Sequence, residues 1–306
     1  MTSSPARTPP PSLGPEPARG SGLSSGLRRT IIAIVIIAIV VIGIISYAVA
    51  GFAYTSTRLA NADKSLNTVI SHQNSINTTF KDMDTKFNGL SNTASFDPTA
   101  AHTLFDQFVA LMKAAGTTID QDDQSLVSAK DSLNQRSWLT TFTRTSLDKE
   151  AARIDHARKG LAIAKTVAGD YVLDGEFIQA FLDAAADLDT LGTQSANADV
   201  ASAKLTLTAM RTHVEKALQL STAPGLPAEL HDLMVDFGTL VTDFGKLLDA
   251  AAAGDNTAVT SAEMRVEADA NKIGKYDFTK IGTEIDTFYK PLVDSFNSEM
   301  ARASAA

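Results

Sequence analysis

Histidines are the side chains in this sequence that could bind a metal ion or change charge near neutral pH. There are five of them: His72, His102, His156, His213 and His231. No two are four residues apart and none has a glutamate three residues before it, so the metal-binding spacings of helical proteins are absent. The chain also has no cysteine, which excludes disulfides, thiol nucleophiles and cysteine-based metal sites. We therefore expect no catalytic residues, no metal site and no cofactor.

His102 and His231 occupy equivalent positions in two similar stretches of sequence. The stretches PTAAHTLFDQFVALM, from Pro98, and PAELHDLMVDFGTLV, from Pro227, share the spacing of proline, histidine, leucine and phenylalanine. If the two stretches pack symmetrically, the histidines would form a pair that titrates near neutral pH or binds a metal. The alternative is that each histidine lies at the edge of the polar face of its helix.

A patch that mixes aromatic and basic residues is the second candidate site. The segment QRSWLTTFTR contains the only tryptophan of the chain. Aromatic rings and arginines together suit the headgroup region of a membrane, or a partner protein. We therefore predict a membrane-interface or partner contact at Arg136, Trp138, Leu139, Phe142 and Arg144. The alternative is that these aromatic residues cap the end of a helical core.

The segment 31–53 is the strongest signal for location. It has no charged residue, and as a helix it would be about 34 Å long, against about 30 Å of bilayer hydrocarbon. Arg28 and Arg29 precede it, so the positive-inside rule places residues 1–30 in the cytoplasm and the rest of the chain outside it. We predict an uncleaved signal anchor; the alternative is a signal peptide cleaved after Ala50, which would release the protein.

Small residues follow one face of the predicted membrane helix. Small side chains allow two helices to approach closely in lipid, so this face could be a dimer seam. The alternative is that small residues are simply common in membrane helices. The residues of the seam are Gly43, Ser46, Ala50 and Ala53.

Apolar residues recur every third or fourth position through most of the remaining chain, which predicts an all-α fold. We expect an antiparallel helical bundle, with a kink at Pro291 in the last helix. The predicted helices are 54–90, 98–134, 145–168, 175–191, 197–221, 227–253 and 256–302, the last of them broken or kinked. Residues 1–30, rich in proline, serine and glycine, should be a disordered tail, and 303–306 a flexible end.

The similarity between the stretches at Pro98 and Pro227 extends weakly to neighbouring helices. It predicts two repeated three-helix units, at 54–190 and 191–302. The alternative is chance, because any two amphipathic helices share the same apolar period.

The charge and layout together point to a class of function. The net charge of −8 repels phosphate, so we expect no nucleic-acid partner. We predict a membrane-anchored, extracytoplasmic interaction or scaffold protein of the cell envelope, without catalytic activity. Its partners would be membrane lipid, another envelope protein and a second copy of the chain. The alternative is a solute- or peptide-binding accessory module with a cavity between the two helical units.

Overall fold

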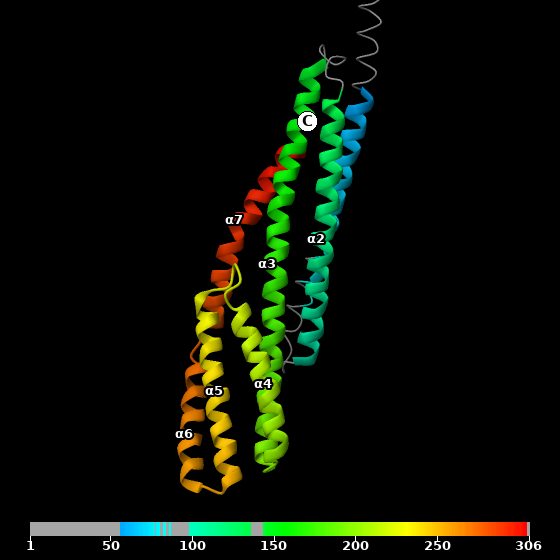
Figure 1. The fold of residues 1–306 in the computed structure, drawn as a ribbon. Coiled ribbons are helices and arrows are strands. Elements are labelled where there is room, and N and C mark those ends of the chain that lie inside the picture. The colour runs from blue at the N-terminus through cyan, green and yellow to red at the C-terminus, as the bar shows by residue number, and fades with distance from the viewer. Residues whose placement is uncertain are drawn as a thin grey trace, which may run out of the picture.

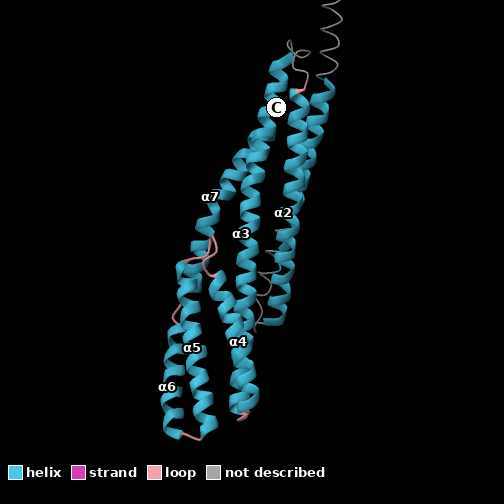
Figure 2. Ribbon diagram, viewed as in Figure 1, coloured by secondary structure: helices cyan, strands magenta, loops and turns pink. Residues whose placement is uncertain are grey.

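The computed structural model describes residues 56–76, 78–79, 82–83, 86, 98–135 and 143–304. These residues are helical almost throughout and include no strand, which confirms the predicted all-α fold. Figure 2 shows helices joined by short turns. A helix that begins at residue 56, called here the N-terminal helix, is followed by α2 (Pro98–Asn134), α3 (Arg144–Ala196), α4 (Val200–Leu220), α5 (Ala228–Ala253), α6 (Asn256–Ile273) and α7 (Phe278–Ser304).

Helix α3 is the longest of the described helices and the central one (Figure 1). It has 53 residues and is therefore about 80 Å long. In Figure 1, α2 lies along α3 from its start to well past its middle and α7 lies beside the middle and first half, while α4, α5 and α6 lie beside and beyond its second half. We call the N-terminal helix, α2, the first half of α3 and α7 the first bundle. The second half of α3 with α4, α5 and α6 is the second bundle.

Each bundle has its own hydrophobic core. The first core joins the N-terminal helix, α2 and α3, through residues such as Leu66, Leu126 and Ile154, to Ala303 near the end of α7. The second core joins α3, from Phe177 onward, to α4 and α5, and includes Ile281 of α7. Both cores therefore take residues from either side of position 190, the predicted boundary between units, because α3 and α7 contribute to both.

The sequence predicted a break in α3 between residues 168 and 175, and the structure shows none. Glycines stand at 169 and 175, and glycine destabilises a helix, yet the helix continues through both. Gly175 has a different role: a Cβ at this position would lie 2.5 Å from Val109 Cγ2 of α2. The glycine allows α2 and α3 to pack closely, and the buried faces on both sides keep the helix continuous.

The last predicted helix, 256–302, was expected to be broken or kinked, and it is broken. It forms α6 and α7, which are separated by the turn at 274–277. Pro291 lies inside α7. Helix α7 continues to Ser304, so the end predicted to be flexible, 303–306, begins inside a helix.

The internal repeat is not supported by the helix pattern. Helix α2 is one helix of 37 residues, whereas the stretch that should match it forms the hairpin of α5 and α6. Gly254 causes the reversal: it has a φ of 70°, and the following Asp255 caps α6 by accepting bonds from two backbone N–H groups. The equivalent region of α2 has no such glycine, and the common helical period accounts for the matching apolar residues.

Among the helices that the structure describes, none is both long and apolar enough to cross a membrane. The predicted anchor, 31–53, and its seam of Gly43, Ser46, Ala50 and Ala53 lie outside the described residues.

Candidate functional site

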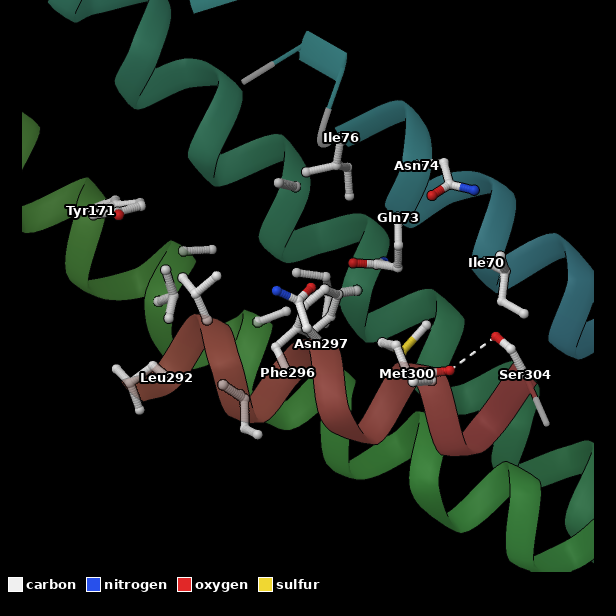
Figure 3. Close-up of a pocket in the computed structure, with 18 residues that line it drawn as sticks. Ile70, Gln73, Asn74, Ile76, Tyr171, Leu292, Phe296, Asn297, Met300 and Ser304 are labelled. Carbon is white, nitrogen blue, oxygen red and sulfur yellow. Dashed lines mark hydrogen bonds between the residues drawn. The ribbon is translucent and has the colours of Figure 1, made fainter. Parts of the chain in front are cut away.

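A groove of about 610 Å³ lies in the first bundle, between the N-terminal helix and α7. Figure 3 shows Ile70, Gln73 and Ile76 on one side and Phe296 and Met300 on the other. Residues of α2 and α3 form its floor. The sequence predicted a cavity between two helical units, whereas this groove lies within one bundle.

Small side chains form part of the floor of the groove. Ala115 of α2 and Ala164 and Ala168 of α3 line it. Helix α7 packs against the same face of α3 at Gly160, where a Cβ would lie 2.9 Å from Met300 Sδ. Gly160, Ala164 and Ala168 recur every fourth residue, so one stripe of small residues both admits α7 and deepens the groove.

The lining of the groove is apolar and carries no charged side chain. Its polar members are neutral: Gln73, Asn74, Tyr171, Asn297 and Ser304. The Gln73 amide already donates to Asp122 Oδ2 at 3.3 Å, and the Ser304 hydroxyl donates to the Met300 carbonyl at 2.9 Å. The groove is therefore suited to a neutral, mainly apolar occupant, because a buried charge would find no partner there.

A buried polar cluster lies where α7 crosses the middle of α3. The Tyr289 hydroxyl lies 2.8 Å from Asp174 Oδ2, to which it donates, and 3.2 Å from the Pro224 carbonyl. Asp174 Oδ1 has no hydrogen-bond partner among the described residues. Gly225 permits this contact: its φ is 90°, and a Cβ there would lie 2.5 Å from the Tyr289 hydroxyl.

Burial alters the ionisation of this cluster. It raises the pKa of Asp174 to about 7; the Tyr289 hydrogen bond opposes the shift, and the charge of Asp170 adds to it. Burial also raises the pKa of Asp170. The ring of Tyr171, which lines the groove, lies 4.5 Å from the ring of Tyr289 between centroids. The cluster is thus in contact with one end of the groove.

The paired histidines of the prediction have separate partners. His102 lies 3.3 Å from Asp106 Oδ2 through Nδ1 and 3.3 Å from Asp183 Oδ1 through Nε2. His231 Nδ1 lies 3.0 Å from the Ser221 hydroxyl. No cluster of metal-ligating side chains occurs in the described part of the chain.

The aromatic and basic patch is described only at Arg144, which pairs with Asp148 at 2.8 Å. Arg136, Trp138, Leu139 and Phe142 lie outside the described residues. The flanking helices can be placed: Arg58 of the N-terminal helix donates to the Leu133 carbonyl at the end of α2, at 3.3 Å. The turn from α2 to α3 therefore begins beside the start of the N-terminal helix, and the membrane or partner contact stays a prediction.

Sequence reasoning missed the groove and the Asp174–Tyr289 contact. The stripe of small residues from Gly160 was a usable signal for close helix packing, but it does not say which helix packs there. For Asp174 there was no signal, because an aspartate on a long amphipathic helix is ordinary.

Comparison with known proteins adds no identity. No protein-family model matches the chain, and no curated protein or solved structure is significantly similar to it.

Proposed function

We propose that this protein is a membrane-anchored, extracytoplasmic helical module of the cell envelope that binds a small apolar ligand in the groove between the N-terminal helix and α7. The groove carries the proposal. Its volume of about 610 Å³ falls within the range of about 300–1,000 Å³ of typical ligand sites, and its apolar lining with a few polar groups is typical of them too. The binding module, predicted as the alternative, is therefore preferred to the scaffold.

The scaffold function has less support. A scaffold would present a contiguous apolar patch to its partner. The large apolar side chains exposed on the described surface are instead spread over α4, α5, α6 and α7, as Leu205, Val235, Met264, Phe288 and Val293, of which Val293 lines the groove. Isolated apolar residues of this kind are normal on soluble surfaces.

The anchor is part of the proposal. The uncharged segment 31–53 follows Arg28 and Arg29 and ends shortly before the N-terminal helix. With this topology, Ile70 would stand about 24 Å above the membrane if the helix continued upright from residue 54. The seam of small residues would allow a homodimer in the membrane, and the module would act by binding rather than by catalysis.

A contact-quenching experiment tests the groove. Because the chain has no cysteine, Asn297→Cys can carry a single bimane fluorophore at the rim, and Ala209→Cys can carry it on the exposed surface of α4. We expect bromobenzene, a compact apolar solute, to quench the rim label of the full-length protein with saturation. The label at residue 209 should show only linear, collisional quenching.

A matched pair of substitutions assigns the effect to the groove. Ala301 is exposed and lines the groove, whereas Ala114 is exposed on α2 and does not line it. Ala301→Phe should abolish the saturable component and Ala114→Phe should leave it unchanged, with thermal unfolding of each confirming that it is folded. Linear quenching at both labels in the unsubstituted protein would contradict the proposal.

A further inference from the structure

We propose that the occupant of this groove is the acyl chain of a lipid from the bilayer in which the protein is anchored. This inference rests on the proposed function and specifies its ligand. Three features of the groove support it: its length, its lack of charge and its position in the chain.

The groove is elongated along α7. Its lining follows α7 from Leu292 to Ser304, a rise of about 18 Å. A single extended hydrocarbon chain rises about 1.3 Å per methylene, so a chain of about 14 carbons spans this length. The length of the groove is therefore suited to one extended acyl chain.

The chemistry of the lining also favours a hydrocarbon. Each methylene that enters an apolar site tightens binding by about fourfold, the equivalent of about 0.8 kcal/mol. Phe296 and Met300 of α7 and Ile70 of the N-terminal helix supply such contacts. A phosphate headgroup would need cations, and no lysine or arginine lines the groove. The headgroup would therefore remain in solvent, at the end formed by Ile70 and Ser304.

The position of the groove supplies the source of the lipid. The N-terminal helix begins just after the proposed anchor, and Ile70 and Ser304 form the end of the groove nearer to it. Because Ile70 would stand about 24 Å above the membrane, a lipid must leave the bilayer to enter the groove, and the anchor holds the groove close to that supply. The opposite end, at Tyr171 and Leu292, would hold the terminal methyl group.

Photocrosslinking in liposomes tests the inference with the full-length chain. Phosphatidylcholine carrying a diazirine at the end of one acyl chain should label α7 and α3 near Leu292 and Tyr171. A diazirine close to the ester should label the region of Ile70 and Ser304. Both lipids should also label the segment 31–53, which serves as an internal reference for each sample.

Substitution separates specific labelling from chance contact. Ala301→Phe should lose the crosslinks in the groove and keep those at 31–53, while Ala114→Phe should keep both. Crosslinks confined to 31–53, or a reversed order of the two diazirine positions, would overturn the inference.

The two proposals fail in distinguishable ways. Saturable quenching by bromobenzene without lipid crosslinks in the groove would leave the binding function standing and reject the acyl chain as its ligand. If a peptide competes with bromobenzene and lipid does not, the groove is a binding site and the acyl chain is not its ligand. Failure of both experiments would reject the groove as a ligand site.

Discussion

The carboxyl group of Asp174 shows how burial changes the chemistry of a single residue in this protein. The side chain is only 7% exposed, and the single hydroxyl of Tyr289 reaches one of its oxygens while the other has no partner among the described residues. A charged carboxylate in this environment lacks most of the hydrogen bonds that water would provide. Protonation relieves that cost, and the pKa of about 7 reflects it.

The pKa of Asp174 predicts a pH dependence of stability. The folded-state pKa of about 7 exceeds the ordinary value of 3.8. Between pH 3.8 and about pH 7, Asp174 is therefore protonated in the folded protein and ionised in the unfolded chain. The contribution of Asp174 to stability therefore falls as pH rises from about 4 to about 7, and it is lowest above that range. Asp174→Asn, which stays neutral, should unfold at a similar temperature to the unsubstituted protein near pH 4 and at a higher temperature near pH 8.

Thermal unfolding followed by circular dichroism across this range measures the effect. The difference in the free energy of unfolding between the variant and the unsubstituted protein should grow by up to a few kcal/mol from pH 4 to pH 8. Asp120→Asn is the matched control, because Asp120 is an exposed aspartate that pairs with Lys165. If Asp174→Asn and the unsubstituted protein keep a constant difference over the whole range, Asp174 does not titrate as proposed.

At the level of helices, the glycines of α3 illustrate what sequence can and cannot predict. The boundaries of α2 and α5 were predicted to within one residue, because proline, glycine and capping residues mark them. The continuity of α3 was not predicted. A glycine inside a helix costs about 1 kcal/mol, but the sequence does not show whether the glycine ends the helix or admits a neighbour, and only the partner helix distinguishes the two cases.

Two substitutions in α3 should therefore have opposite effects on stability. A Cβ at Gly169 would meet nothing within 4 Å, whereas at Gly175 it would lie 2.5 Å from Val109 Cγ2. Gly169→Ala should stabilise the protein by about 0.5–1 kcal/mol through helix propensity. Gly175→Ala should destabilise it by about 1–3 kcal/mol, because α2 must move to accept the methyl group.

Urea unfolding of both variants checks this pair. A gain in stability for Gly175→Ala would show that α2 and α3 are not in close contact there. Gly175→Ala combined with Val109→Ala should recover part of the loss, since the second substitution removes the clashing methyl group.

The groove also depends on which helices pack together, and the sequence does not show this. The groove requires the N-terminal helix and α7, which are far apart in sequence, on neighbouring faces of α3. The amphipathic pattern of α7 predicted a helix, but not that it leaves the second bundle and packs on the first. The apparent repeat suggested a different arrangement, because apolar period is shared by all amphipathic helices while the turn at Gly254 is specific to one.

The arrangement of the whole molecule gives an orientation for the bundle. The end of α2 lies beside the start of the N-terminal helix through Arg58 and Leu133, so these two helix ends share one end of the first bundle. The second bundle, with α4 to α6, extends toward the other end of α3 (Figure 1). If the N-terminal helix continues from an anchor at 31–53, the segment 136–142 falls close to the bilayer surface.

Trp138 reports this orientation, because it is the only tryptophan of the chain. Tryptophan prefers the headgroup region, and neighbouring arginines can pair with anionic lipid. We expect its fluorescence in liposomes to be quenched more by lipids brominated near the headgroup than by lipids brominated near the chain ends. Trp138→Phe with Leu205→Trp moves the reporter to an exposed site on α4 in the second bundle, where neither lipid should quench it. Equal quenching at both positions would mean that the bundle lies along the membrane, and no quenching at Trp138 would place its ring against the protein core.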